Sequence, residues 1–299
     1  MRIQKATHLG MCFGVRDAIA LATREARHGP VTVLGQLVHN PAVIDHLRRH
    51  HVFTAESLAD ARPGPVVISA HGASDITRER LRQSGRPVLE TTCPLVHHAH
   101  RALAKLVADG FHPVVVGKRG HVEVRGLTED LPEYDIILSR EEVHALRERP
   151  RYGVVAQTTQ PVDRVLRLVE ALRHRFPHSE VRFSDTVCRP TKDRQQAAID
   201  LARRSTVMVV IGGANSNNTR ELATSCARFC RRVHQIESAE ELRPAWFRSN
   251  DLVGITAGTS TPDDVIGKVE GTLRGWAHHA GELKRACRQE ESHAAIHAI

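Results

Sequence analysis

The chain has 299 residues, of which 41% are hydrophobic and 4% aromatic, and its formal net charge is +8. This composition is typical of a soluble protein with a sizeable core. No apolar run approaches the ~20 residues of a membrane helix, and the N-terminal residues lack the apolar stretch of a secretion signal, so we expect a cytoplasmic protein that does not span a membrane. The positive charge suits anionic partners. The few aromatic residues argue against a base-stacking surface for nucleic acid.

In chain order, three segments repeat one plan: a cysteine, a helical pattern, and a valine-rich strand that ends at a glycine 23 or 24 residues after the cysteine. The cysteine and glycine of each segment are Cys12 and Gly35, Cys93 and Gly117, and Cys188 and Gly212. A repeat of this kind indicates three similar structural units.

Polar residues follow the strands of each segment. One comes 27 or 28 residues after the cysteine, and another follows a second apolar strand. These residues are His39 and His71, His121 and Thr158, and Ser216 and Ser260. Strands that alternate with helices predict parallel sheets, whose ligands bind beyond the carboxyl ends of the strands. We therefore expect an α/β fold of three pseudo-symmetric modules with mainly parallel sheets, which direct their cysteines and polar groups at a common centre.

The same spacing predicts the module boundaries. We expect a first module over residues 13–93, a second over 94–188 and a third over 189–278, with residues 1–12 packing near the third. The polar segment 279–299, which contains Cys287, is predicted to be a flexible tail.

The three repeated cysteines precede helical patterns. A helix N-terminus carries partial positive charge and favours the thiolate, the form that binds metals. Three thiolates could hold an iron–sulfur cluster with one iron open to substrate. They could also form a structural zinc site with a histidine, although the chain lacks the close cysteine pairs of most zinc sites. The residues alone therefore predict a three-thiolate site.

The candidate residues around that site come from the strand ends. They are His39, His71, His121, Glu123, Thr158, Ser216, Asn217, Asn218 and Ser260. Histidine, serine and asparagine beside helix N-termini suit a phosphate or diphosphate. Glu123 is the one carboxylate in the group, which makes it the natural proton donor. Its position two residues after His121 would place both side chains on one side of an extended segment.

Eight short motifs occur in order along the chain. They are Cys12–Val15, Val38–Asn40, Ser69–Gly72, Thr92–Val96, Gly120–Val124, Gln157–Thr159, Asn215–Asn218 and Thr256–Ser260. In these motifs the chain resembles the 4-hydroxy-3-methylbut-2-enyl diphosphate reductase family, also called LytB/IspH, over nearly its whole length. The resemblance implies an oxidoreductase of the last step of the non-mevalonate isoprenoid pathway. Such an enzyme uses two electrons and two protons, releases water, and makes isopentenyl and dimethylallyl diphosphate.

The resemblance also implies roles for individual residues. Cys12, Cys93 and Cys188 would hold one [4Fe–4S] cluster per chain, and Glu123 with Thr158 would deliver a proton to the departing hydroxyl. The substrate would be bound by His39, His71, His121, Thr158, Ser216, Asn217, Asn218 and Ser260. A ferredoxin or flavodoxin would supply the electrons.

Some positions depart from the family pattern. Asn217 stands where a second serine is usual, Val122 where proline is usual, and Lys118 where histidine is frequent, and Arg189-Pro190 follow Cys188. They leave open a paralogue with another substrate, a protein like quinolinate synthase, or a non-catalytic iron–sulfur sensor.

Other cysteines and histidines are assigned no chemistry. Cys226 and Cys230 are predicted to be buried thiols on one helical face. The group His97, His98 and His100 is predicted to lie at the surface.

Overall fold

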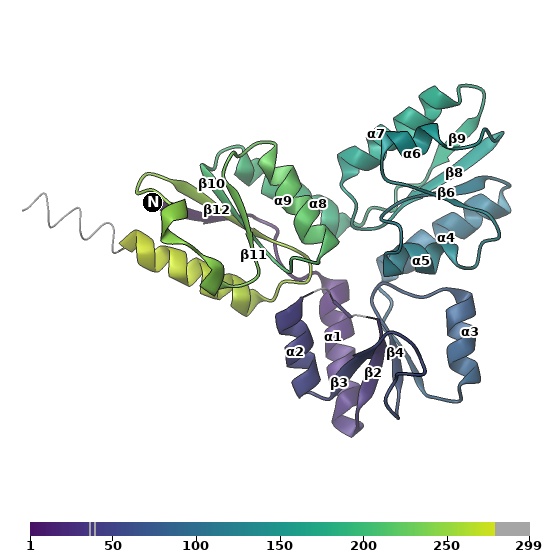
Figure 1. The fold of residues 1–299 in the computed structure, drawn as a ribbon, viewed down its shortest axis with the longest axis horizontal. Coiled ribbons are helices and arrows are strands. Elements are labelled where there is room, and N and C mark those ends of the chain that lie inside the picture. Colours follow the sequence, from purple (N-terminus) through teal and green to yellow (C-terminus); the bar gives the residue numbers. More distant parts are fainter. Residues whose placement is uncertain (36, 39, 279–299) are drawn as a thin grey trace, which may run out of the picture. The chain divides into compact units, whose positions relative to one another are not determined.

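The computed structural model of the chain describes residues 1–35, 37–38 and 40–278 (Figure 1). The fold divides into two compact units. One consists of Met1–Met11 together with the chain from Arg194 onward, and the other of Cys12–Asp193. No helix within the described ranges combines the length and apolar character needed to cross a membrane.

Three four-stranded sheets organise the described chain, and every strand pairing in them is parallel. Their strand orders are β3-β2-β4-β5, β7-β6-β8-β9 and β11-β10-β12-β1. In each sheet the first strand of the repeat lies second, between the next strand and the one after it. The prediction of three α/β modules with parallel sheets is confirmed, whereas the exact module boundaries stay a prediction. The predicted tail, 279–299, lies outside the described residues.

The unit Cys12–Asp193 contains two of the sheets. The elements of the first are α1 (Phe13–Glu25), η1 (Ala26–His28), β2 (Val31–Leu34), α2 (Pro41–Arg49), β3 (Val52–Ala55), β4 (Val66–Ile68), α3 (Asp75–Gln83) and β5 (Val88–Glu90). The elements of the second are α4 (Pro94–Ala108), β6 (His112–Val116), α5 (Val122–Thr128), β7 (Asp135–Ile137), α6 (Arg140–His144), β8 (Arg151–Ala156), α7 (Val162–Arg175) and β9 (Glu180–Phe183).

The second sheet shows why the strands are rich in valine. Successive residues of a strand face opposite sides, so Val114 packs in a core with Leu168 of α7, and Val115 packs in another with Leu103 of α4. Helices therefore cover both faces, as in other parallel sheets. This covering leaves the carboxyl ends of the strands free to carry polar residues.

The other unit contains the third sheet. Its elements are β1 (Arg2–Lys5), α8 (Arg189–Ala202), β10 (Val207–Ile211), α9 (Asn217–Ala227), β11 (Val233–Ile236), η2 (Ala239–Glu241), η3 (Pro244–Trp246), β12 (Leu252–Ala257) and a helix over 263–278. Helix α8 begins in Cys12–Asp193 and continues across the boundary between the units. Strand β1 comes from the start of the chain and pairs with β12 in register Ile3 to Val253. The N-terminal residues thus supply the fourth strand of this sheet.

Candidate functional site

The three repeated cysteines each stand directly before a helix of the structure. Cys12 precedes α1, Cys93 precedes α4 and Cys188 precedes α8. Residues at such positions often bond the helix amides through their side chains, but neither Cys12 nor Cys93 forms a side-chain cap of this kind. Their thiols are half-buried and in no disulfide. Each of the three predicted cluster ligands thus stands at the N-terminus of a helix.

The pKa values of the cysteine thiols show that Cys12 interacts electrostatically with both Cys93 and Cys188. Burial raises the pKa of the Cys93 thiol, and the amides of Leu95 and Val96 partly offset this effect. Burial also raises the pKa of Cys188 to about 11. The hydroxyl of Thr191, whose Oγ1 lies 3.1 Å from the Cys188 Sγ, opposes this rise. Negative charge on Cys12 contributes to both upward shifts. Burial therefore outweighs the helix N-terminus at these two thiols, and nearby positive charge, such as that of a bound metal, would favour their thiolates.

Within the described residues, no group of three or more His, Cys, Asp or Glu side chains is close enough to hold one metal ion. A structural zinc ion needs its ligands about 2.3 Å from a single point. A [4Fe–4S] cluster instead binds its thiolates at separate corners.

Gly14 lies against one of these sulfurs, which the sequence interpretation did not anticipate. A Cβ atom at Gly14 would lie 2.6 Å from Sγ of Cys93, closer than real Cβ contacts allow. The signal in the sequence is a glycine in the first turn of a predicted helix, where alanine would favour the helix. The missing side chain lets the start of α1 approach the Cys93 sulfur.

Glu123 and Thr158 form a buried pair. Glu123 is 1% exposed, and both of its carboxylate oxygens are contacted by Thr158. The Thr158 amide donates to Oε1 at 2.6 Å, and its Oγ1 lies 3.0 Å from Oε2. Burial raises the pKa of Glu123 to about 7, and the Thr158 bonds oppose this rise. The carboxyl group can therefore hold or release a proton near neutral pH.

The same threonine links the carboxylate to a cysteine. The Thr158 carbonyl accepts from the Cys188 amide at 3.0 Å. In addition, negative charge on Glu123 contributes to the raised pKa of both Cys93 and Cys188. The Glu123–Thr158 pair and the predicted cluster ligands thus belong to one region of the unit.

The expected extended segment at His121 and Glu123 is wrong. Glu123 lies in the first turn of α5, and His121 caps that helix by accepting from the Glu123 amide through Nδ1 at 3.2 Å. The helix buries the Glu123 side chain on the same element whose Val124 and Leu127 pack in the core with α4. The His121 ring caps the helix, whereas the Glu123 side chain is buried.

His71 approaches His121 from the other sheet of the unit. The two rings are 5.4 Å apart in an edge-to-face arrangement. Ser69, which is buried, lies with Oγ 3.3 Å from Nδ1 of His71. Two imidazoles at this separation can donate to neighbouring oxygens of one anion. His39, the third predicted histidine, lies outside the described residues.

The remaining predicted residues belong to the unit of the third sheet. Ser216 caps α9 by accepting from Thr219 at 3.3 Å, and Asn218 accepts from the Thr259 amide at 3.0 Å. Nδ2 of Asn217 and Oγ of Ser260 are buried and have no hydrogen-bond partner among the described residues. Buried polar groups are normally bonded, so these two atoms fit a bound ligand with acceptor oxygens.

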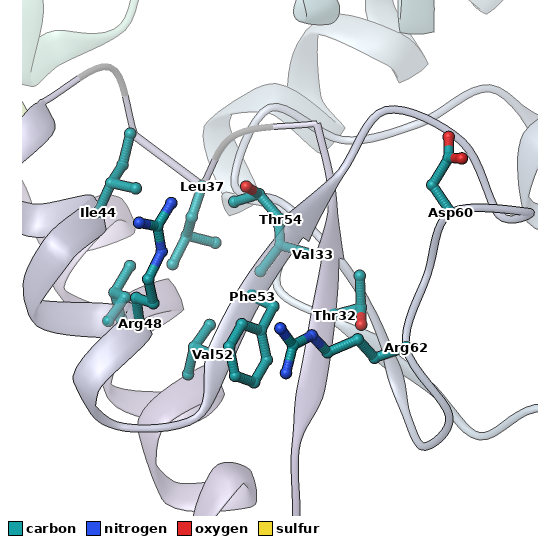
Figure 2. Close-up of a pocket in the computed structure, with 11 residues that line it drawn as sticks. Thr32, Val33, Leu37, Ile44, Arg48, Val52, Phe53, Thr54, Asp60 and Arg62 are labelled. Carbon is teal, nitrogen blue, oxygen red and sulfur yellow. The ribbon is translucent and has the colours of Figure 1, made fainter.

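A separate cavity of about 370 Å³ lies at edge strand β3, away from these residues (Figure 2). Its walls include Thr32, Leu37 and Arg48, and the guanidinium of Arg62 lies 3.6 Å from the centre of the Phe53 ring. Among the described residues, none of the predicted cysteines, histidines or carboxylates lines it. The candidate site is therefore not this cavity.

The structure also tests the features to which no chemistry was assigned. Cys226 and Cys230 are buried in an apolar core, as predicted, although α9 ends before Cys230. The prediction for the histidine group is right only for His98, because His97 and His100 are half-buried. Burial lowers the pKa of His100, and nearby Arg78 lowers it further.

Comparisons with known proteins identify the family. The family model described as "LytB protein" matches residues 3–274. A 4-hydroxy-3-methylbut-2-enyl diphosphate reductase of Geobacter metallireducens is 38% identical over 92% of this chain and 97% of its own, and one of Aquifex aeolicus is 35% identical over 90% and 94%.

Solved structures agree with this assignment. The structure of an (E)-4-hydroxy-3-methyl-but-2-enyl diphosphate reductase, titled the terminal enzyme of the non-mevalonate pathway, is 34% identical with a TM-score of 0.68, over 92% of this chain and all of that one. The structure of E-1-hydroxy-2-methyl-but-2-enyl-4-diphosphate reductase from Plasmodium falciparum is 25% identical with a TM-score of 0.82, over 91% and 87%. With one sequence pattern and one fold shared over nearly the whole chain, this protein belongs to the LytB family.

Proposed function

We propose that the protein reduces (E)-4-hydroxy-3-methylbut-2-enyl diphosphate to isopentenyl and dimethylallyl diphosphate. The reaction takes up two electrons and two protons, breaks the C–O bond of the hydroxyl group and releases water. The observation that carries the proposal is the buried Glu123–Thr158 pair, in the same unit as three cysteines that stand before helices. The shared family of the named reductases supports it.

We propose Cys12, Cys93 and Cys188 as the ligands of one [4Fe–4S] cluster. They stand directly before helices, and the electrostatic effect of Cys12 on the pKa of both Cys93 and Cys188 supports the proposal. When bound, the cluster would supply electrons and a Lewis-acidic iron for the substrate hydroxyl group. The residues present therefore fit the group that the family resemblance implies.

Glu123 and Thr158 are proposed to move the proton. Because Oε1 accepts from the Thr158 amide, the carboxyl proton is favoured on Oε2, beside the threonine hydroxyl. Thr158 can accept that proton while it gives its own to the departing hydroxyl group. A hydroxide ion leaves poorly, and protonation turns it into water.

The diphosphate is proposed to bind to the histidine, amide and hydroxyl groups that the family resemblance implies. His71 and His121 lie edge to face within Cys12–Asp193. Asn217 and Ser260 carry buried donors with no partner in the described chain. Ser216 and Asn218, at the start of α9, and His39 complete the proposed set.

We further propose an acidic ferredoxin or flavodoxin as the electron donor. The net charge of +8 on the chain suits the approach of such a protein. Weak, salt-dependent association is typical of electron-transfer complexes.

The test is anaerobic purification followed by iron analysis, visible spectroscopy and turnover. We expect a brown protein with about four irons per chain, the content of one [4Fe–4S] cluster. With a chemical reductant it should convert the allylic diphosphate to the two isomeric products. Serine at position 12, 93 or 188 should lower the iron content, whereas Cys226→Ser should leave it intact.

Two other results would contradict the proposal. A stable cluster without turnover of this substrate would favour a sensor or a paralogue that resembles quinolinate synthase. A colourless protein with one zinc per chain would contradict the cluster assignment itself.

A further inference from the structure

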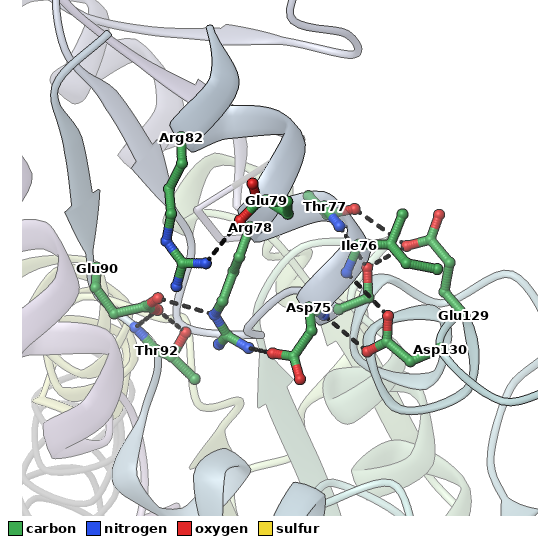
Figure 3. Close-up of polar contacts among 11 residues, drawn as sticks. Asp75, Ile76, Thr77, Arg78, Glu79, Arg82, Glu90, Thr92, Glu129 and Asp130 are labelled. Carbon is green, nitrogen blue, oxygen red and sulfur yellow. Dashed lines mark hydrogen bonds and ion pairs between the residues drawn. The ribbon is translucent and has the colours of Figure 1, made fainter. Parts of the chain in front are cut away.

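Two acidic residues after α5 hold the beginning of α3 (Figure 3). The Asp130 carboxylate accepts from the amide of Asp75 at 2.7 Å and from the amide of Ile76 at 3.0 Å. The neighbouring Glu129 accepts from the hydroxyl of Ser74 at 2.5 Å and from the hydroxyl of Thr77 at 3.1 Å. These four bonds join the two sheets of the unit Cys12–Asp193.

The Asp130 bonds satisfy backbone amides of α3 that have no hydrogen-bond partner within the helix. The first amides of a helix have no partner within the helix, and the helix dipole favours negative charge there. Ser74 already caps α3 by accepting from the Thr77 amide at 3.0 Å. Asp130 takes up two further amides, so the start of α3 is fixed by a residue 55 positions later in the chain.

A close contact accompanies these bonds. Gly126 of α5 lies against the backbone of Ala73, whose Cα is 3.5 Å from the place where a Cβ of Gly126 would be. Beside this contact is a cavity of about 310 Å³, whose walls include Ser69, Gly72 and Val122. The packed and bonded contacts thus form one rim of a cavity whose walls include residues on both sides of His71 and the residue after His121.

The other side of α3 is tied to the segment before Cys93. Arg78 pairs with Asp75 at 3.4 Å and with Glu90 at 3.2 Å. Glu90 in turn accepts from both the hydroxyl and the amide of Thr92. Helix α3 is therefore held between α5 and the residue that precedes a proposed cluster ligand (Figure 3).

His71 lies on the short connection between β4 and α3. Six residues, 69–74, join the two elements, so a shift of the start of α3 is transmitted to the His71 side chain. His121 caps α5, the helix that Glu129 and Asp130 follow. The same bonds that join α3 to α5 thus set the distance between the two imidazoles, now 5.4 Å.

We propose that Asp130, together with Glu129, is a positioning residue for substrate binding. It holds the start of α3 against α5 so that His71 and His121 face one diphosphate at a fixed spacing. The inference rests on the proposed binding of the diphosphate by these two histidines. Neither acidic residue touches the substrate in this account, and neither takes part in proton transfer.

The test compares the double variant Glu129→Gln, Asp130→Asn with the wild-type holoenzyme. Both substitutions keep the side-chain shape and remove the charges that accept from α3. We expect KM and the dissociation constant for inorganic pyrophosphate to rise about fivefold, the scale of a lost helix cap. Because Glu123 and Thr158 are unchanged, kcat should stay within about twofold of wild type.

A chemical probe reports the histidines directly. Pyrophosphate should protect His71 and His121 together from diethyl pyrocarbonate in the wild type, as measured by mass spectrometry of the two peptides. In the double variant, protection of His71 should be lost at concentrations that still protect His121. Asp130→Glu, which keeps an anionic acceptor, should restore most of the binding.

Glu133→Gln is the matched control. It removes one acidic charge nearby and an ion pair with Arg149 of 3.0 Å, and it should leave KM and protection unchanged. The inference is overturned if the double variant protects His71 normally with unchanged pyrophosphate affinity, or if it loses kcat, iron and affinity together. The single variant Asp130→Asn distinguishes the joint loss of kcat, iron and affinity from simple unfolding. It retains one acceptor at position 130 and both Glu129 bonds.

The measurements also separate this inference from the proposed activity. If the wild type binds pyrophosphate in an Asp130-dependent manner but does not reduce the allylic diphosphate, the activity is wrong and the positioning role stands. If the wild type turns over but the variants bind normally, the positioning role is wrong and the activity stands.

Discussion

At Glu123, burial and hydrogen bonding act on the pKa in opposite directions. The carboxyl group is 1% exposed, and loss of hydration disfavours its charged form. The amide and hydroxyl of Thr158 favour the charged form, yet the pKa still rises to about 7. Burial therefore dominates, which suits the proposed role of Glu123 as a proton donor.

This pKa makes the stability of the protein depend on pH. Below the ordinary value of 4.5 the group is neutral in both the folded and unfolded chain. As the pH rises from 4.5 towards about 7, the unfolded chain ionises first, so the stabilising contribution present at low pH is lost. The loss is on the order of 3 kcal/mol.

Urea unfolding of the wild type and of Glu123→Gln between pH 5 and 8 measures this effect. The stability of the glutamine variant relative to wild type should increase across the window, because glutamine does not titrate. A constant difference across the window would show that Glu123 is ionised throughout.

The same variant tests the proton transfer. Glutamine can accept from the Thr158 amide and donate to its hydroxyl, so the cluster should assemble and substrate should bind. The rate should fall by about 10²–10⁴, the usual contribution of a positioned acid. Wild-type kcat should also decline as the pH rises above about 7, and near-normal turnover of the variant would place the proton donor elsewhere.

At the level of elements, three helices, α1, α4 and α8, each begin directly after a cysteine. Helix α1 begins directly after Cys12, and its second residue, Gly14, lies against the Cys93 sulfur of α4. A glycine inside a helix normally costs up to about 1 kcal/mol relative to alanine. The close contact explains why the smaller residue stands there.

Gly14→Ala should therefore lower the iron content of the anaerobically purified protein. The added methyl group would meet Sγ of Cys93 at 2.6 Å and displace it. Gly271→Ala is the control, because Gly271 lies in the helix over 263–278 with no atom within 4 Å of an added Cβ. We expect normal iron content and equal or higher thermal stability for the control; equal iron content in both variants would contradict the role of the contact.

On the scale of the whole molecule, one strand order occurs three times. Each sheet places its strands in the order second, first, third, fourth, and β1 from the chain start completes the last sheet. The polar residues at the carboxyl ends of β4, β8 and β12 thus have equivalent places within their own sheets. This equivalence supports the proposal that His71, Thr158 and Ser260 bind one substrate.

Ser260→Ala and His71→Ala test that proposal, because the two residues lie in different units. Each variant loses a hydrogen bond to a charged group, worth about 1.5–3 kcal/mol, so each should raise KM for the same substrate tenfold or more. Ser260→Ala should not lower the melting temperature, since its buried Oγ has no partner within the described chain. A rise of KM in only one variant would mean that the substrate contacts only that unit.

The local sequence pattern was sufficient to predict several features of the fold. Valine-rich strands ending at Gly35, Gly117 and Gly212 predicted the three parallel sheets, because strands covered on both faces must be apolar throughout. Helical periodicity after Cys12 and Cys93 predicted where α1 and α4 begin. These features depend on neighbours in the chain, which a sequence displays directly.

Local pattern failed at residues 121–123, where a strand-like segment was expected and α5 forms. The cap that starts this helix is an imidazole nitrogen of His121 accepting from the Glu123 amide. Histidine is not among the residues that usually signal a helix start, so the sequence offered little indication of it.

The sequence by itself determined the family, the three-module architecture and the chemical types of the candidate residues. The tertiary structure alone decided which of them meet: Thr158 with Glu123, His71 with His121, and Asp130 with the start of α3. These pairs lie 35 to 55 residues apart in the chain. Their proximity depends on strand register and helix packing, and the raised pKa of Glu123 depends on burial, which only the folded chain creates.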